Sequence, residues 1–342
     1  MNSITPRPLE QSCNWTAPDV SNPDDWTLQL SKNDVAEINS ALEVAKRTGR
    51  DFLDISKTEF PLPNLSAKLK TLESDLMTGR GFGLIRGLPR DNYDNNEMCM
   101  IYWGIGAHLG KPWPQNKHGH MLGDVTDQGR RADDPEARGN EIGGMSLDFH
   151  TDGCDLVGLL CLNNGKSGGE SAVCNSVTIY NRMVEEAPEL AAELFKPQPY
   201  DFRGEQGEGA KAWYEVPVFT EHKDRIFIRY IRPYILASQR HEDAPRITEL
   251  AEQAMQYLDR LILDENYHVY MMLQPGDMQF VNNYHVLHAR KAYQDDRDNG
   301  QVRHLKRLWL ETEILEDRPV YFANNVSHHW SKKKVISRMD AL

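Results

Sequence analysis

Two spacings of apolar residues run along this chain, and together they predict a few helices and many short strands. Apolar residues recur every three or four positions, as on one face of a helix, over residues 33–50, 65–79, 96–108, 184–195 and 247–263. Short apolar or alternating runs, which are typical of strands, lie at 81–87, 145–149, 155–162, 172–175, 214–220, 225–231, 268–273, 278–281, 284–287 and 305–312. Many short strands covered by a few helices predict a mainly β, α+β fold, and we expect a double-sheet jelly roll.

The first 30 residues follow neither spacing. They are polar and rich in proline and asparagine, with Trp15 and Trp26 as isolated apolar anchors. The rest of the chain has no internal repeat, no low-complexity tract and no long linker. We therefore predict an N-terminal arm over residues 1–30, lying on the surface of a single domain over residues 31–342.

The composition narrows the partners that the protein can bind. It has 51 acidic and 39 basic residues, a formal net charge of −12 and no basic stripe, which argues against nucleic acid and anionic membranes. No apolar run reaches the length that spans a bilayer, and the first residues lack the apolar core of a signal peptide. Five cysteines without a CxxC pair suit a reducing compartment. These features predict a cytoplasmic protein and leave a homo-oligomer open.

One short stretch, residues 149–153, carries the first candidate chemistry. His150 and Asp152 are two positions apart, so on an extended strand both side chains leave the same face. An imidazole beside a carboxylate is two thirds of the 2-His-1-carboxylate set that holds non-haem Fe(II). The same triplet also occurs in surface turns, so the interpretation depends on a third ligand.

The third ligand is sought in residues 276–290, which contain two histidines. His285 and His288 are three positions apart and therefore face opposite sides of a strand, so only one of them can join the metal. We favour His288, because it follows an apolar pair and precedes Ala289, where a strand would run inward.

Two arginines follow at positions suited to binding an anion. Arg303 and Arg307 alternate with apolar residues, so both project from one face of a strand. An oxygenase with three protein ligands needs a bidentate co-substrate, and a guanidinium can clamp the free carboxylate of that molecule. The alternative is that these arginines form surface salt bridges on an edge strand.

Polar residues in two turn-rich segments are candidates for substrate contact. The loop 110–124 brings amide and imidazole groups together, and a second group lies just before His288. The candidates are Gln115, Asn116, His120, Asn282 and Asn283. Such groups suit a small polar molecule. The charged stretch 130–140 predicts a lid or excursion.

The order of these motifs resembles a known family. His-x-Asp at 150–152, Gly-Gly-x-Ser at 168–171, Asn-x-x-x-x-x-His-x-Arg at 282–290 and Arg-His-Leu-x-Arg at 303–307 are similar to the taurine dioxygenase (TauD/TfdA) family. The resemblance covers about residues 80–315 and implies the double-stranded β-helix of clavaminate-synthase-like enzymes. The N-terminal 80 residues match no pattern that we can name.

The resemblance also implies a ligand set and a reaction. His150, Asp152 and His288 would hold Fe(II), and Arg303 would anchor the distal carboxylate of 2-oxoglutarate with help from the Ser171 hydroxyl. Arg307 would assist or reach an anionic substrate. Because His288 and Arg303 are slightly further apart than the family pattern suggests, Arg307 stays an alternative anchor.

The implied activity is a dioxygenase that hydroxylates an unactivated C–H bond. O₂ and 2-oxoglutarate would be its co-substrates, and 2-oxoglutarate would become succinate and CO₂. The expected substrate is a small polar molecule, such as an amino acid or a secondary-metabolite precursor. The alternatives are a non-oxidative cupin-like metalloenzyme, such as an isomerase or hydrolase, and an inactive binding module of the same fold.

Overall fold

A computed structural model describes residues 5–312 and residue 319 of the chain. Its helices are α1 (Lys32–Arg47), α2 (Leu65–Thr78), α3 (Asn95–Leu109), α4 (Ser176–Glu186), α5 (Pro188–Glu193), α6 (Arg232–Ala237) and α7 (Glu249–Ile262). Its strands are β1 (Thr27–Gln29), β2 (Phe82–Arg86), β3 (Lys111–Trp113), β4 (Leu122–Val125), β5 (Leu147–His150), β6 (Leu156–Asn163), β7 (Ser167–Gly168), β8 (Ser171–Asn175), β9 (Pro197–Asp201), β10 (Trp213–Pro217), β11 (Phe219–His222), β12 (Arg225–Ile228), β13 (His268–Met271), β14 (Met278–Asn282), β15 (Val286–Arg290), β16 (Tyr293–Gln294) and β17 (His304–Glu311). None of the helices in these residues is both long enough and apolar enough to cross a bilayer.

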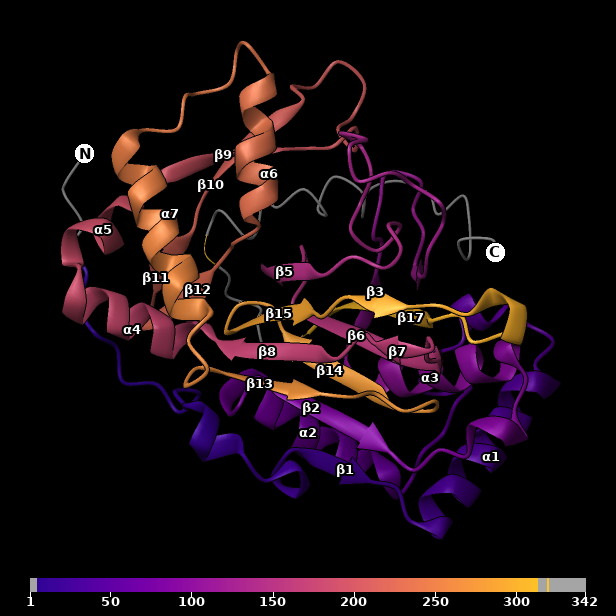
Figure 1. Ribbon diagram of the computed structural model, residues 1–342. Coiled ribbons are helices and arrows are strands. Elements are labelled where there is room, and N and C mark those ends of the chain that lie inside the picture. Colours follow the sequence, from indigo (N-terminus) through magenta and orange to yellow (C-terminus); the bar gives the residue numbers. More distant parts are fainter. Residues whose placement is uncertain (1–4, 313–318, 320–342) are drawn as a thin grey trace.

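Two β-sheets form the centre of the molecule (Figure 1). The larger sheet has the order β1-β2-β14-β6-β17-β3, with β4 also paired to β17, and the smaller has the order β13-β8-β15-β5. The pairs are antiparallel except for β1 with β2. This mixture of facing sheets and covering helices confirms the predicted α+β fold class.

The alternation of side chains along the strands explains why the two sheets face each other. On β8, Val173 joins a core cluster with residues of the larger sheet, whereas Ala172 and Cys174 belong to a cluster with helices α4 and α7. On β15, Val286 belongs to the cluster with the larger sheet, and Leu287 belongs to the cluster with the helices. Successive strand residues point to opposite faces, so odd positions of β8 and even positions of β15 face the space between the sheets.

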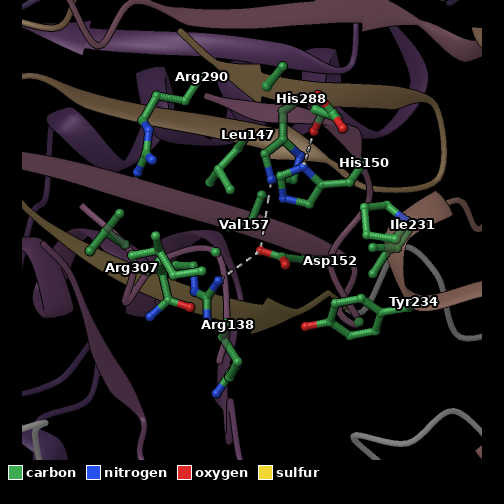
Figure 2. Close-up of a pocket in the computed structure, with 18 of the residues that line it drawn as sticks. Arg138, Leu147, His150, Asp152, Val157, Ile231, Tyr234, His288, Arg290 and Arg307 are labelled. Atoms are coloured by element: carbon green, nitrogen blue, oxygen red, sulfur yellow. Dashed lines mark hydrogen bonds and ion pairs between the residues drawn. The ribbon is translucent and has the colours of Figure 1, made fainter. Parts of the chain in front are cut away.

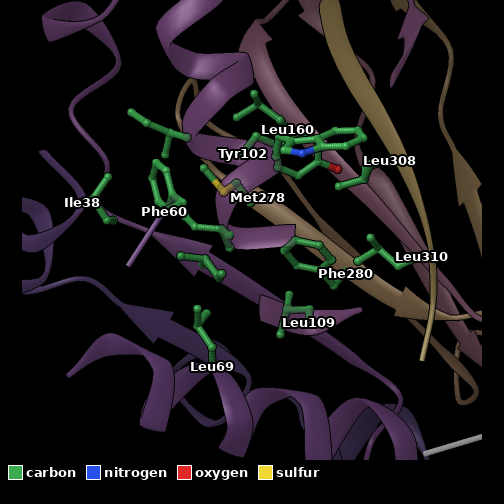
Figure 3. Packing of buried hydrophobic residues seen from close by; sticks show 14 of the residues in the cluster. Ile38, Phe60, Leu69, Tyr102, Leu109, Leu160, Met278, Phe280, Leu308 and Leu310 are labelled. Carbon is green, nitrogen blue, oxygen red and sulfur yellow. The ribbon is translucent and has the colours of Figure 1, made fainter. Parts of the chain in front are cut away.

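Helices α1, α2 and α3 cover the outer face of the larger sheet, where the largest apolar cluster lies (Figure 3). Ser31 and Asp34 form a capping box that begins α1, and Asp94 and Glu97 form another that begins α3. Gly104 on α3 is required by packing, because a Cβ atom there would lie 2.3 Å from the Phe60 ring. The absence of a side chain at Gly104 thus lets α3 pack closely against the turn segment that carries Phe60.

The other helices differ from their predicted extents for local reasons. The single helix predicted over 184–195 is wrong: α4 begins at Ser176, where the Asn175 side chain accepts two backbone N–H groups, and Pro188 starts a separate helix, α5. The strand predicted over 214–220 is also divided. β10 pairs with β9, and β11 pairs with β12 around Lys223 and Asp224, which both have positive φ.

The N-terminal segment is packed onto the larger sheet through its two tryptophans. The Trp15 and Trp26 rings lie 5.3 Å and 5.6 Å from the Phe82 ring, centroid to centroid, and both are buried. β1 then pairs with β2 in parallel register. The division into an arm over residues 1–30 and a domain over 31–342 stays a prediction, and much of residues 313–342 lies outside the described part of the chain.

We expect Phe280→Ala to destabilise the fold strongly. Phe280 is fully buried on β14, and its ring lies 6.1 Å from that of Tyr102. Truncating a buried aromatic side chain leaves a cavity and costs about 3–5 kcal/mol of unfolding free energy. Urea unfolding measures this loss. Leu263→Ala is the control, since Leu263 is 67% exposed and its truncation changes stability little; equal losses for both variants would contradict the predicted core.

Candidate active site

A cavity of about 360 Å³ opens between the two sheets. Inward-facing residues of β5, β6, β8, β14, β15 and β17 line it, together with residues of two loop segments, 137–146 and 202–205. The lining includes all three predicted metal ligands together with Ser171, Arg303 and Arg307. The paired sheets therefore bring together residues that lie far apart in the sequence.

Strand pairing places the two histidines opposite each other. β5 ends at His150, which is directly opposite His288 of β15 in the antiparallel register, and their ring centroids lie 4.2 Å apart. Asp152 lies in the turn that follows β5. One ligand atom from each of His150, Asp152 and His288 lies within 4.8 Å of the other two. The three groups thus form a cluster that could hold one metal ion.

The prediction that His150 and Asp152 lie on one strand is wrong in detail, because β5 ends before Asp152. The turn is instead held by hydrogen bonds. The Asp152 N–H donates to Oδ1 of Asn283 over 2.9 Å, and the Thr151 carbonyl accepts from the Arg229 guanidinium over 2.9 Å. These contacts aim the Asp152 carboxylate back toward the two imidazoles.

The Asp152 carboxylate is surrounded by cationic and donor groups (Figure 2). Trp309 donates its indole N–H to Oδ2 over 3.1 Å, and the Arg307 and His288 nitrogens lie 3.7 Å and 3.9 Å away. Burial raises the pKa of Asp152, but Arg307 and the imidazoles outweigh burial and hold that pKa below its usual range. Asp152 is therefore an anion at neutral pH.

The two imidazoles are neutral at the same pH. Burial, with a smaller effect of the neighbouring His150, lowers the pKa of His288 to about 3, and burial also lowers the pKa of His150. His150 Nδ1 lies 2.7 Å from the Asp148 carbonyl, which leaves Nε2 as its free ring nitrogen. Neutral imidazoles and an ionised carboxylate are the protonation states that a divalent metal requires, so these residues fit Fe(II).

His285, the other candidate ligand, lies elsewhere. It is buried in contact with the Phe227 ring, and its Nε2 lies 3.5 Å from the Arg225 guanidinium. Burial, with a smaller contribution from Arg225, lowers its pKa to about 3. Because His285 is not part of the cluster, the preference for His288 agrees with the geometry.

The two candidate anchoring arginines occupy different parts of the cavity. Arg307 is inside β17 and also donates Nε to Oε1 of Gln115 over 2.8 Å. Arg303 directly precedes β17, is 3% exposed, and has a buried guanidinium nitrogen without a hydrogen-bond partner. Burial, followed by the charge of Arg290, lowers the pKa of Arg303 to about 10, so it remains a cation at neutral pH. Arg303 and Ser171 both line the cavity.

The five predicted substrate residues do not line this cavity. Gln115 instead supports Arg307, and Asn283 supports the Asp152 turn. Asn116 accepts two backbone N–H groups of its own loop and lies 3.0 Å from the His120 ring nitrogen. Asn282 donates to the Leu76 carbonyl. Gln115 and Asn283 thus support the site from outside it, whereas the contacts of Asn116 and Asn282 involve none of the predicted metal ligands or anchoring arginines.

Sequence reasoning missed several residues of the cavity. Trp309 and Arg290 could have been found by strand period, because each lies two positions after a predicted site residue, Arg307 or His288. Arg138 and Tyr234 come from segments without a regular spacing, and only the three-dimensional arrangement brings them to the site.

Comparison with known families agrees with this geometry. The model of the taurine catabolism dioxygenase TauD, TfdA family matches residues 45–309. The chain belongs to this family. FR-33289 synthase of Streptomyces rubellomurinus is 30% identical to this TauD/TfdA protein over 336 residues, which cover 97% of this chain and 98% of that enzyme. Enduracididine beta-hydroxylase of Streptomyces hygroscopicus is 24% identical to this protein, and the alignment covers 87% of this chain and 97% of that enzyme.

Solved structures show the same fold. Asparagine oxygenase in complex with Fe(II), 3-hydroxyasparagine and succinate aligns with this TauD/TfdA protein at a TM-score of 0.65 and 18% identity, covering 84% of this chain and 94% of that one. The non-haem iron oxygenase OrfP with Fe and alpha-ketoglutaric acid aligns at a TM-score of 0.61 and 17% identity, with the same coverage. The predicted double-stranded β-helix is thereby confirmed.

The TauD/TfdA protein is an Fe(II)/2-oxoglutarate-dependent dioxygenase. Its family and the His-Asp-His cluster together confirm the predicted enzyme class and cofactors. This outcome disagrees with the alternative of a non-oxidative cupin-like metalloenzyme.

We expect Asn283→Ala to weaken Fe(II) binding by roughly ten- to a hundred-fold, the usual effect of removing a residue that orients a metal ligand. The variant loses the hydrogen bond that fixes Asp152 in its turn. Anaerobic Fe(II) titration measures the affinity. Asn282→Ala is a matched control, because Asn282 is equally buried and makes similar backbone contacts away from Asp152. An equal effect of both substitutions on iron affinity would refute the positioning role.

Proposed function

We propose that this enzyme hydroxylates a small anionic or zwitterionic molecule, such as an amino acid or a secondary-metabolite precursor. His150, Asp152 and His288 hold Fe(II), while Arg303 and Ser171 hold the distal carboxylate of 2-oxoglutarate. One observation carries this assignment: the cavity that contains the three clustered ligands also contains a buried guanidinium with a free donor. A dicarboxylate that chelates the metal and reaches Arg303 would satisfy both features.

The contacts of the two arginines favour Arg303 as the 2-oxoglutarate anchor. Arg307 is already engaged by Asp152 and Gln115, so its charge is partly neutralised beside the metal cluster. Arg303 has no ion pair with any carboxylate in the described residues, and Ser171, which also lines the cavity, offers a hydroxyl. A buried charge without a partner is costly, and a bound carboxylate removes that cost.

Arg307 and the loop residues then face the substrate. Arg138 lines the cavity beside Asp152 and donates to the Gln115 carbonyl over 3.1 Å. The Glu205 carboxylate lies 3.9 Å from the Arg138 guanidinium. Guanidinium groups suit a carboxylate of the substrate, and Glu205 suits an amine. The structures of asparagine oxygenase with 3-hydroxyasparagine and of OrfP with (3S)-hydroxy-L-Arg contain amino-acid products, which supports an amino-acid-like substrate here.

The residues of the chain position the reactants and exclude water. Bound iron, with 2-oxoglutarate and O₂, supplies the C–H oxidation and yields succinate and CO₂. Asp152 would hold the metal through its carboxylate, to which Trp309 donates its indole N–H. The two loop segments that line the cavity are joined where the Arg203 guanidinium donates to the Ala137 carbonyl over 2.8 Å. Loops joined in this way limit the access of bulk water to a reactive site.

We expect His150→Ala and Asp152→Ala each to abolish the weak visible absorption band of the Fe(II)–2-oxoglutarate chelate and the formation of succinate. Each substitution removes one of three protein ligands. Anaerobic absorption spectroscopy detects the chelate. His118→Ala is the control, since His118 is exposed and outside the cavity. Persistence of the band and turnover in both ligand variants would overturn the metal assignment.

We expect Arg303→Gln to raise the 2-oxoglutarate requirement by roughly ten- to a hundred-fold, because hydrogen bonds to a charged group contribute about 1.5–3 kcal/mol. Arg307→Gln should instead raise the requirement for the prime substrate. KM values for both molecules, measured by succinate release, separate the two roles. If only Arg307→Gln affects 2-oxoglutarate, the two arginines have exchanged roles. Screening amino acids and small carboxylates for stimulated succinate release identifies the prime substrate.

A further inference from the structure

Arg290 is a buried cation of the cavity to which the proposed function gives no role. It lies two positions after His288 on β15, so both side chains leave the strand on the face between the sheets. Its antiparallel partner on β8 is Ser171. Figure 2 shows Arg290 on the far side of Leu147 from Asp152, and both Arg290 and Arg303 line the cavity.

Arg290 and Arg303 form a pair of incompletely satisfied guanidiniums. Each has a buried nitrogen without a hydrogen-bond partner, Nε in Arg290 and one terminal nitrogen in Arg303. Within residues 5–312, neither forms an ion pair with a carboxylate, although Arg290 donates to the Met145 carbonyl over 2.6 Å. Two buried like charges repel each other, and an anion between them relieves both the repulsion and the missing hydrogen bonds.

Tyr293 connects the two arginines. Its ring centroid lies 4.8 Å from the Arg290 guanidinium carbon and 5.2 Å from that of Arg303. The Tyr293 hydroxyl is buried and has no hydrogen-bond partner. Gly169 leaves room beside this group, because a Cβ there would lie 2.8 Å from Nε of Arg303. Arg290, Arg303 and Ser171 therefore line one end of the cavity, and the Tyr293 ring packs against both guanidiniums.

We propose that Arg290 is a second anion-binding residue of the co-substrate site, so that the distal carboxylate of 2-oxoglutarate binds between two guanidiniums. This inference rests on the proposed function, since it extends the site assigned to Arg303 and Ser171. Arg290 is then a determinant of co-substrate specificity. A 2-oxo acid without a distal carboxylate leaves both cations unpaired and is rejected more strongly than a single arginine would reject it.

A purely structural role for Arg290 predicts different behaviour. In that case its bond to the Met145 carbonyl would hold the segment before β5, and its loss would destabilise the protein without ligand. It would also affect every 2-oxo acid equally, because β5 carries His150. Under the proposal, removing one of two repelling charges leaves the unliganded protein as stable as before or more stable, and only the dicarboxylate loses affinity.

The test compares Arg290→Gln with wild type and with Lys291→Gln, a neighbouring exposed cation, as the control. Anaerobic calorimetry with the Fe(II)-loaded enzyme measures the affinities for 2-oxoglutarate and for 2-oxopentanoate, which has the same chain length and no distal carboxylate. We expect Arg290→Gln to weaken the binding of 2-oxoglutarate at least ten-fold and the binding of 2-oxopentanoate less than two-fold. Equal weakening of the two acids, or unchanged 2-oxoglutarate affinity, would overturn the proposal.

Thermal unfolding supplies the second readout. In Arg290→Gln, the rise in unfolding midpoint on adding 2-oxoglutarate should be smaller than in wild type, while the midpoint of the unliganded protein should not fall. A lower midpoint of the unliganded protein, with an unchanged rise on adding 2-oxoglutarate, would instead indicate the structural role. If that variant does not fold, Arg290→Lys should weaken 2-oxoglutarate binding several-fold and leave 2-oxopentanoate binding unchanged, and an unaltered 2-oxoglutarate affinity would refute the proposal. Failure of the wild type to bind 2-oxoglutarate would overturn the proposed function itself.

Discussion

The antiparallel register of β5 with β15 is the constraint on which the site depends. It sets His150 opposite His288, and no metal cluster could form between these strands if the register shifted by one residue. Such a shift would turn every side chain of one strand to the other face. The neighbouring pairing of β15 with β8 fixes the same strand from its other edge, so the position of His288 is determined twice.

The face between the sheets is divided along its length between apolar packing and chemistry. On β15, Val286 packs in the apolar cluster, His288 joins the metal ligands and Arg290 lines the cavity. On β17, Leu305 and Trp309 similarly flank Arg307. Each strand therefore contributes to stability and function through one row of alternate residues, while the other row binds the covering helices.

The part of the site that lies on strands could be predicted from the sequence, because the two-residue alternation of a strand shows there which reactive side chains share a face. His288 and Arg303 are near strands whose alternation is visible in the chain, and both line the cavity as expected. The turn that aims Asp152 could not be predicted, since it depends on Asn283, 131 residues away. Gln115 was assigned to substrate although it bonds to Arg307, because an amide in a loop gives no sign of its partner.

The pairing of β1 with β2 has a consequence for how the protein associates. β1 covers one margin of the larger sheet, and Trp15 and Trp26 hold the preceding segment against Phe82. Without these residues, β2 would present unpaired backbone N–H and C=O groups beside uncovered aromatic surface. An open strand of that kind can pair with strands of other molecules, so the pairing with β1 removes one route to aggregation from the edge of β2.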